Sequence, residues 1–480
     1  MPTTRIAVAG GGPAGTVIAV RLVQLGHDVV LVTGTPSRRS HSVETLTPGV
    51  SKQLKFLRLG DALDGARVLP AADRQLKWQN NRFEPNLAVK PGALVERSAF
   101  DAGLITAVTR QGVTMLPAEV RRVERIVDGW RLVCESAEGP VTVISSFLVD
   151  ATGRRGVLPR KRLRKQHLLG LRGRWRGARL PNCVRVAAHD QFWAWGAPAA
   201  DRTYEAILFL DPRNLNRART SLEQRYRFLV SVCGLLDGAE PAECIGPVQA
   251  CDATPYVELD AVGEDFLKIG DACLTVDPLA SAGVQIAIQS AVSGAAAIHT
   301  LRGDPAATGL ITAFWSGELA RRNTRHTRWS AEFYRIAAER FATPFWRSRA
   351  APQSDATPPV NHANREMLPR PDQALRLSST LGIVDAPCVV ADKIELRRTV
   401  AHPSLSEPVA FLDGVDLPLL LASIAPGVTA AGILHSWSRN VDPRRGVAIL
   451  SWIWRRGLIE PLPPGGLWHL HSDFAQTQSV

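Results

Sequence analysis

Three glycines near the start of the chain have the types and the spacing of a phosphate-binding loop. The pattern Gly10-x-Gly12-x-x-Gly15 follows an apolar run that predicts a strand, and it leads into a predicted helix. Glycines so placed allow a tight turn and a close approach of the backbone to a pyrophosphate, and the helix N-terminus adds positive potential. The predicted dinucleotide contacts are Gly10, Gly12, Pro13, Ala14 and Gly15.

A second segment, about 260 residues later in the chain, narrows the choice of dinucleotide. The N-terminal loop alone does not separate the cofactors, because NAD(P) and FAD use such a loop alike. A distant Gly-Asp segment in this order along the chain favours FAD. The residues of this second segment that we expect at the cofactor are Gly270, Asp271, Pro278, Gly283 and Val284.

In these stretches the chain resembles the flavoprotein monooxygenases of the aromatic hydroxylase class, and more closely their tryptophan-halogenase-like branch. Two further stretches, Val95–Asp101 and Phe147–Gly153, carry the same resemblance. The resemblance implies that Arg97 lies against the flavin nucleotide and that Asp271 bonds the ribityl chain. It also implies a helix, starting near Gly283, whose N-terminal dipole favours the anionic reduced flavin.

The segment after the second predicted strand also bears on the cofactor. In the halogenase-like branch a Glu-x-x-x-Pro stretch lies along the flavin, which implies that Glu44 and Thr45 face FAD. The strand before this segment ends in Thr33, where such folds usually place an acidic residue on the adenosine ribose. Because Arg38 and Arg39 follow closely, NADP in this pocket is an alternative to FAD; a solvated loop is the preferred interpretation of these arginines.

A pair of tryptophans is the best candidate for the substrate side of the site. Flavin-dependent halogenases carry Trp-x-Trp-x-Ile-Pro, and this chain has Trp193-x-Trp195-x-Ala197-Pro198. The resemblance implies that Trp193 and Trp195 stand beside the flavin. Halogenation in the family also needs a lysine, for which Lys77 is the candidate, although its flanking residues differ from the family pattern and an ordinary strand lysine is the alternative.

Other catalytic chemistries find little support in the sequence. None of the eleven histidines lies in a metal or hydrolase motif, and the seven cysteines lack metal-ligand spacing. We therefore predict no metal site and reduced thiols, as in a cytoplasmic protein. No second nucleotide-binding glycine loop is visible. A reduced nicotinamide, NADH or NADPH, is therefore expected to bind only transiently as electron donor, unless a separate flavin reductase supplies reduced flavin.

The composition is that of an ordinary soluble globular protein. Of 480 residues, 45 % are hydrophobic and 21 % charged, and no run of eighteen apolar residues predicts a membrane span. A strand entered by Arg5 leaves no room for a cleavable signal peptide. The formal charge of +12 comes without a nucleic-acid-binding signature, so we expect mainly solvated arginines, with an acidic polypeptide partner as the functional alternative.

The predicted fold class is α/β: a Rossmann-like FAD-binding domain with an interleaved β-rich substrate domain and an added C-terminal, mostly helical module. The linker is indicated by its proline- and alanine-rich composition. The C-terminal module ends in a predicted helix closed by Arg455-Arg456-Gly457, which suggests a winged-helix-like arrangement. The predicted segments are 1–165 and 261–345 for FAD binding, 166–260 for the substrate domain, 346–374 for the linker and 375–480 for the C-terminal module.

Three functions follow from these observations. The preferred hypothesis is an oxygen-consuming FAD monooxygenase that hydroxylates a tryptophan or tyrosine side chain within a partner peptide or protein, as in the branch that matures quinone cofactors. The altered tryptophan motif, the unmatched lysine and the added module favour it. The alternatives are a small-molecule aromatic hydroxylase or halogenase, and a non-catalytic flavin-binding scaffold.

Overall fold

The computed structural model describes residues 5–34, 42–69, 73–86, 92–215, 220–239, 241–350 and 368–462. The chain forms two compact units. The first comprises Met1–Gln353 with Val389–Ile394, and the second comprises Ser354–Cys388 with Glu395–Val480. Arg38, Arg39 and most of the predicted linker lie outside the described residues.

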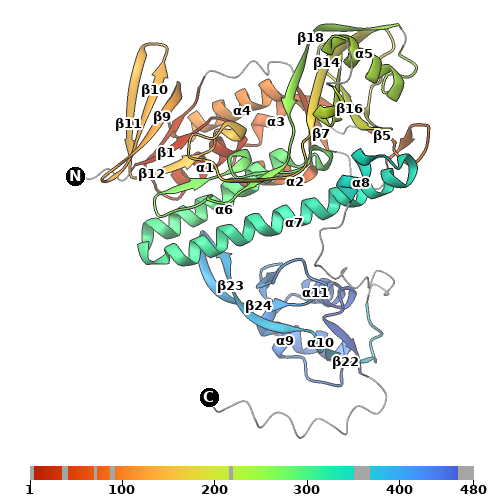
Figure 1. The fold of residues 1–480 in the computed structure, drawn as a ribbon. Helices are drawn as coiled ribbons and strands as arrows, with labels where there is room; N and C mark the ends of the chain where they lie inside the picture. The colour runs from red at the N-terminus through yellow and green to blue at the C-terminus, as the bar shows by residue number, and fades with distance from the viewer. Residues whose placement is uncertain are drawn as a thin grey trace. The chain divides into compact units, whose positions relative to one another are not determined.

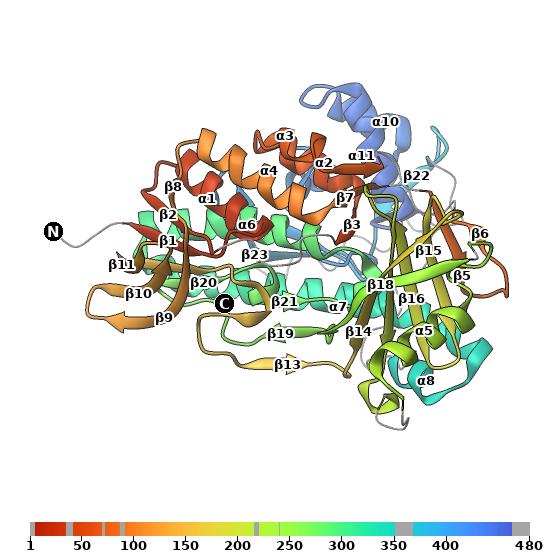
Figure 2. The same ribbon diagram turned by 90° about the horizontal axis from the view of Figure 1, so that it is seen from above.

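A five-stranded parallel sheet forms the nucleotide-binding part of the first unit (Figure 2). Its two faces are covered differently: Ile6 and Val8 face a core shared with helices, whereas Ala7 and Ala9 contact an antiparallel meander. Burial on both faces explains the continuous apolar runs in these strands. In spatial order the strands are β20 (Phe266–Lys268), β12 (Phe147–Asp150), β1 (Ile6–Ala9), β2 (Val29–Val32) and β8 (Thr114–Leu116), and the meander is β9 (Ala118–Ile126), β10 (Gly129–Ser136) and β11 (Gly139–Ser145).

A seven-stranded mixed sheet forms the substrate side of the same unit. Two of its strands come from residues 74–85, inside the segment that the sequence assigned to FAD binding. Side chains alternate between the two faces of the sheet; one face carries Trp193 and Trp195, and the other packs against a helix, α5 (Leu222–Cys233). The strands in order are β18 (Ala242–Asp252), β14 (Leu169–Gly177), β17 (Tyr204–Leu210), β16 (Phe192–Pro198), β15 (Val184–His189), β5 (Arg74–Lys77) and β6 (Glu84–Pro85).

The first unit also contains two three-stranded sheets, and each contributes a strand to the lining of the cavity described below. The first contains β3 (Val43–Leu46), β7 (Ala93–Glu96) and β4 (Arg67–Leu69). The second contains β13 (Arg162–Arg164), β19 (Tyr256–Glu258) and β21 (Leu274–Thr275).

Long helices join the two parts of the first unit, and Figure 1 shows α7 (Thr308–Phe341) running from the parallel-sheet end to the mixed-sheet end. Its early residues pack with the parallel sheet's core, and Tyr334 near its end packs with the tryptophans. Among the described residues one helix, α6 (Gly283–Gly303), is long and apolar enough to cross a membrane, but 72 % of its most apolar window is buried as core. The remaining helices are α1 (Pro13–Gln24), α2 (Pro48–Phe56), α3 (Asp61–Asp64), α4 (Arg97–Arg110) and α8 (Pro344–Ala350).

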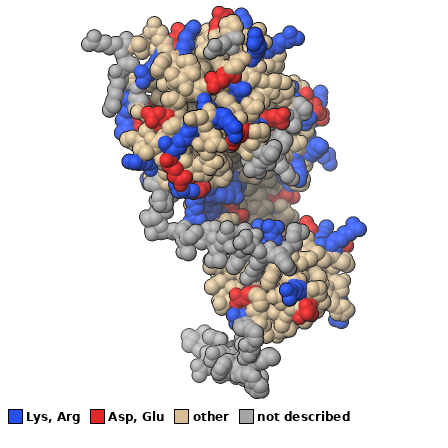
Figure 3. Space-filling model, turned by 90° about the vertical axis from the view of Figure 1, so that its right-hand side faces the viewer, with Lys and Arg blue, Asp and Glu red and all other residues tan. Residues whose placement is uncertain are grey.

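Charged side chains on the first unit are largely balanced locally. On the face shown in Figure 3, basic and acidic side chains are interspersed over most of this unit. Surface arginines such as Arg5 and Arg335 form ion pairs with neighbouring carboxylates. Because solvent screens such exposed ion pairs, they contribute little to the stability of the fold.

The second unit has its own apolar core and contains helices where the sequence predicted them, together with several short strands. A small sheet in the order β27-β22-β28 packs with three helices, and each helix begins at a side-chain cap: Asp416, Thr429 and Asp442. The winged-helix-like assignment stays a prediction. The elements are β22 (Ala374–Leu377), β23 (Gly382–Val390), β24 (Lys393–Ala401), β25 (Phe411–Leu412), β26 (Val415–Asp416), α9 (Leu417–Ala422), β27 (Val428–Thr429), α10 (Ala430–Trp437), α11 (Pro443–Arg455) and β28 (Ile459–Pro461).

Candidate active site: a cavity at a nucleotide-binding loop

The glycine loop has the geometry that a pyrophosphate requires. Gly10 has φ of +109°, and a Cβ there would lie 2.4 Å from the carbonyl oxygen of Ala151. A Cβ on Gly15 would lie 1.8 Å from the Gly10 carbonyl oxygen, so this glycine is needed for the helix to pack on the loop. By contrast, nothing lies within 4 Å of a Cβ on Gly12, and the first turn of α1 carries no acidic residue. This open space at a helix N-terminus fits a dinucleotide phosphate.

The structure brings the Gly270-Asp271 segment against that loop. The segment follows β20, which pairs in parallel with β12. Gly270 has φ of +57°, and a Cβ there would meet the Ala14 side chain at 2.9 Å. Its amide donates to the Ser290 hydroxyl at 3.0 Å. The two glycine segments, about 260 residues apart, therefore form one continuous site.

A cavity of about 280 Å³ lies beside this junction. Five of the predicted cofactor residues line it, and so do both predicted tryptophans. Apolar side chains from the mixed sheet, including Ile207 and Phe209, complete its wall. The predicted residues on the lining are Glu44, Thr45, Asp271, Pro278, Gly283, Trp193 and Trp195.

Arg97 lies just behind the lining rather than on it. Its guanidinium forms ion pairs with Glu44 and with Asp101, both at 2.8 Å. Burial alone would lower the pKa of Arg97, but the two carboxylates outweigh it and raise that pKa, so the arginine stays charged. The hydroxyl of Thr45, which is buried, makes no hydrogen bond within the protein and fits a polar group of a bound cofactor.

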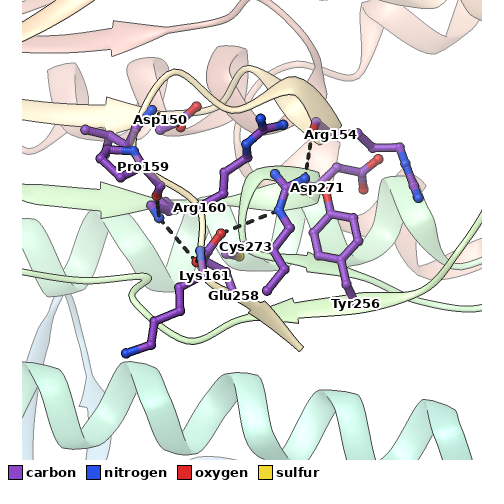
Figure 4. Close-up of polar contacts among 12 residues, drawn as sticks. Asp150, Arg154, Pro159, Arg160, Lys161, Tyr256, Glu258, Asp271 and Cys273 are labelled. Atoms are coloured by element: carbon purple, nitrogen blue, oxygen red, sulfur yellow. Dashed lines mark hydrogen bonds and ion pairs between the residues drawn. The ribbon is translucent and has the colours of Figure 1, made fainter. Parts of the chain in front are cut away.

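Arg154, which the sequence analysis missed, also lines the cavity. Its guanidinium donates to the Thr254 carbonyl at 2.6 Å and lies 5.2 Å from the centre of the Tyr256 ring. The Tyr256 hydroxyl donates to the Asp271 backbone carbonyl at 2.5 Å (Figure 4). Arg154 and Tyr256 therefore position the wall of the cavity that carries Asp271.

Beneath this wall lies a buried charge cluster, also drawn in Figure 4. Glu258 has a side chain that is 0 % exposed, and Lys268 lies 3.5 Å from one carboxylate oxygen. The Arg162 guanidinium lies 3.5 Å from the other oxygen and stacks 4.2 Å from the Tyr256 ring centre. Tyr256 and Glu258 lie on the same strand, β19, and Arg162 is the residue of β13 that pairs directly with Glu258.

Trp193 is fixed by a chain of polar contacts that only the structure shows. Trp193 stacks on Phe209 with ring centres 4.0 Å apart, and its indole N–H donates to the Tyr334 hydroxyl at 3.2 Å. Tyr334 in turn donates to an Asp277 carboxylate oxygen at 2.9 Å. Burial raises the pKa of Asp277, opposed by the Leu279 amide and by Tyr334. The signal for Tyr334 in the sequence was weak, because it lies 141 residues from Trp193.

Lys77 does not belong to this site. It pairs in register with Ala187, which pairs with Ala194, and paired residues share a face. That face is opposite to the one that carries Trp193 and Trp195. The Lys77 ammonium lies 3.7 Å from Asp237 instead. The structure thus argues against Lys77 as the catalytic lysine, because strand alternation places it on the α5 side of the sheet.

Two predicted residues remain: Pro13 is the buried first residue of α1, and Val284 is buried in the core next to Gly283, and neither lines the cavity. Among the described residues, no group of three or more His, Cys, Asp or Glu side chains could hold a metal ion. The described arrangement therefore offers an apolar chamber next to a dinucleotide site, with carboxyl and guanidinium groups on one wall.

Two of the curated proteins that resemble the chain in sequence are flavin-dependent or tryptophan halogenases. No protein-family model matches the chain. It is 26 % identical to a tryptophan 2-halogenase of Chondromyces crocatus over 374 residues, which cover 72 % of this chain and 70 % of that protein. It is 27 % identical to the flavin-dependent halogenase armH5 of Armillaria mellea over 341 residues, which cover 62 % of this chain and 64 % of that protein, just under two thirds of its length.

Two solved structures share the fold over nearly the whole chain. One is the peptidyl tryptophan dihydroxylase QhpG, with a TM-score of 0.72, 24 % identity, and coverage of 95 % of this chain and 99 % of that chain. The other is the flavin-dependent halogenase CmlS, with a TM-score of 0.77, 20 % identity and 96 % coverage of both. At these identities the likeness shows the fold alone.

The parallel sheet, the two glycine segments and the cavity beside their junction fit the class of FAD-binding flavoproteins. These features and the sequence relatives show that the protein is a flavin-dependent oxidoreductase related to the tryptophan-halogenase-like flavoproteins. FAD as cofactor and the α/β fold with a Rossmann-like sheet, both predicted from the sequence, are confirmed. The nicotinamide donor and the separate reductase stay predictions.

Proposed function

We propose that this protein is an FAD-dependent monooxygenase that hydroxylates a tryptophan or tyrosine side chain within a partner peptide or protein, during biogenesis of a quinone cofactor. The observation that carries the choice of hydroxylation is the lining of the cavity. Two tryptophans from the altered motif face the predicted flavin residues, and no lysine is among the described residues on that lining. Halogenation in the family needs a lysine beside the substrate.

The peptide substrate is supported by likeness along the whole chain. The fold shared with a peptidyl tryptophan dihydroxylase covers 99 % of that protein, including the part that corresponds to the second unit. An added unit with its own core could supply contacts to a polypeptide away from the reacting ring. Remote contacts of this kind help to orient a ring for reaction.

The residues of this chain would have distinct roles. FAD supplies the chemistry that activates oxygen. The apolar wall of Trp193, Ile207 and Phe209 would hold the aromatic ring and exclude water. Asp277, which lines the cavity and has a raised pKa, would accept the ring proton that is released after the new C–O bond has formed, when the C–H bond at the same carbon breaks and the ring becomes aromatic again. Tyr334 would hold that carboxylate in place through its hydrogen bond.

Halogenation is the second candidate, and the sequence relatives favour it. Both curated relatives described above are halogenases at 26–27 % identity, and CmlS shares the fold. A small-molecule hydroxylase is the third, since aklavinone-11 hydroxylase, solved with FAD and aklavinone, shares the fold at a TM-score of 0.57 over 71 % of this chain. Both alternatives predict a free small molecule as substrate.

The test is a product analysis with the FAD-loaded protein. Reduced flavin, oxygen and chloride are supplied with free tryptophan in one reaction and with a tryptophan-containing partner polypeptide in another, and products are weighed by mass spectrometry. We expect mass gains of one or two oxygen atoms on the polypeptide alone. Efficient oxidation of free tryptophan, or a chlorine mass shift on either substrate, would overturn the proposal.

A further inference from the structure

A second cavity, also of about 280 Å³, lies in the first unit behind the wall of the candidate active site. The two cavities share Val276 and Asp277 as lining residues. Tyr334 lines only the second cavity, yet it donates to Asp277, and Trp193 on the first cavity donates to Tyr334. None of the roles proposed above uses the second cavity.

Two cationic side chains, Lys165 and Arg349, line this second cavity together with His326, whose pKa is lowered by burial and by the nearby Arg325 and Arg322 so that its neutral form is favoured. No described carboxylate lies within ion-pair distance of the Lys165 ammonium, and burial lowers the pKa of this lysine. Burial likewise lowers the pKa of Arg349, a shift that Asp211 and Asp277 oppose, and the hydrogen bonds of this arginine go to the carbonyl oxygens of Phe345 and His167. Asp277 is the one carboxyl group among the described lining residues, and it is already bonded to Tyr334.

This imbalance of charge indicates what the cavity can bind. Lys165 loses water without a carboxylate as ion-pair partner, and Arg349 makes its hydrogen bonds to carbonyl oxygens, so an anion in the cavity would offset part of the cost of burying them. Neutral donors, including Asn323 and Thr327, stand beside them on the lining. The remaining wall is apolar, with Leu168 and Val276 among its residues. A bare inorganic ion would leave this apolar wall uncovered, whereas a carboxylate on a short hydrocarbon stem would satisfy both kinds of wall.

We propose that the second cavity is a binding site for an organic carboxylate, held by Lys165, Arg349 and His326. The planar fork of arginine suits a carboxylate, and charge-assisted hydrogen bonds are the strong ones. The carboxylate comes from a free small acid or from an acidic side chain of a bound polypeptide, since both present the same group. Because Asp277 lies on both cavities, an occupant here sits next to the wall of the active site.

The proposal is tested by isothermal titration calorimetry on the full-length, FAD-loaded protein. Butyrate represents a free acid, and N-acetylaspartate N-methylamide represents an acidic side chain within a peptide. Butyramide and inorganic phosphate are the matched neutral and inorganic probes. We expect saturable binding of one or both carboxylates, with weaker binding of butyramide and phosphate; the tighter carboxylate identifies the source.

Lys165→Met should weaken carboxylate binding by about tenfold or more, and Arg349→Gln should act in the same direction. Lys161→Met is the control, because that side chain is 68 % exposed outside the cavity and should leave binding unchanged. Circular dichroism and FAD content check that each variant folds. Equal binding of phosphate, unchanged binding in Lys165→Met, or no saturable binding at millimolar carboxylate would overturn the proposal.

Discussion

At the scale of single residues, the wall of the active site depends on one buried hydrogen-bonded chain. Trp193, Tyr334 and Asp277 come from a strand, a helix and a loop, and each donates to or accepts from the next. Tyr334 is 1 % exposed, so an unpaired hydroxyl there would be costly. These two hydrogen bonds therefore fix both the plane of the Trp193 indole and the position of the Asp277 carboxyl group, which lines the same cavity.

Asp277→Asn should lower turnover and remove the acidic limb of the pH profile. A raised pKa means that the carboxylate, which is the base, is populated only above that pKa, so turnover of the native protein should rise as pH increases through it. The amide cannot accept the proton at any pH. The measurement is kcat against pH at matched FAD content, and an acidic limb that persists in the variant would contradict the assigned role.

Gly12→Val should strongly weaken FAD binding and leave the fold intact. The Gly12 backbone has φ of −77°, which valine adopts readily, and no protein atom would meet the new Cβ within 4 Å. The side chain would instead occupy the space that fits the pyrophosphate. We expect FAD affinity to fall by about tenfold or more, measured by fluorescence titration. Gly309→Val, at an exposed and open position, is the control; normal FAD affinity in Gly12→Val would show that the phosphate binds elsewhere.

At the scale of elements, the small sheet β13-β19-β21 connects a buried charge cluster to the Gly270-Asp271 segment, which we call the cofactor segment. β19 carries both Tyr256, which holds the Asp271 carbonyl, and Glu258, which neutralises Lys268 and Arg162. Lys268 also donates to the Pro159 carbonyl at 2.6 Å. One short strand thus fixes the backbone of the cofactor segment and a cluster that is costly to break.

Glu258→Gln should destabilise the protein by about 3–5 kcal/mol, because it leaves the buried Lys268 ammonium without its carboxylate. The measurement is the free energy of unfolding from urea denaturation. Glu264→Gln, at an exposed position nearby, is the control and should change stability by less than about 0.5 kcal/mol. A small effect of Glu258→Gln would mean that water or a second group already stabilises Lys268.

At the scale of the whole molecule, the first unit is completed by a short stretch from late in the chain. Residues 389–394 belong to this unit although most of their flanking hairpin belongs to the other. Ile394 is 2 % exposed in the core of the parallel sheet and its helices, and its amide donates to the Thr300 hydroxyl of α6 at 2.8 Å. Asp392 forms an ion pair with Arg21 of α1.

Ile394→Ala should therefore destabilise the FAD-binding unit, although it lies far along the chain from the cofactor segments. Truncation of a buried isoleucine costs about 2–5 kcal/mol. The measurement is thermal unfolding, monitored by the fluorescence of released FAD, which reports on the first unit. Leu396→Ala, at a residue that is 58 % exposed, is the control. Equal unfolding temperatures for the two variants would show that the 389–394 stretch adds nothing to this core.

The sequence by itself predicted FAD as the cofactor and the two glycine segments that the structure brings together. The pattern of residue types indicates the cofactor site directly, because its geometry depends on glycines at short, fixed spacings. These residues are Gly10, Gly12 and Gly15 in the N-terminal loop and Gly270 and Asp271 in the second segment. The apolar runs that form the parallel strands are legible for the same reason, since burial on both faces requires them. FAD binding and the fold class were predicted on these grounds.

The tertiary structure alone decided which side chains meet across the active site. The sequence offered both the tryptophan pair and, with unmatched flanking residues, Lys77 as catalytic candidates, but the register of β5, β15 and β16 places them on opposite faces. Tyr334 and Trp193 lie 141 residues apart and carry no local signal of their hydrogen bond. Local patterns specify backbone geometry and burial, whereas the pairing of strands and helices distant in sequence sets which polar groups share a cavity.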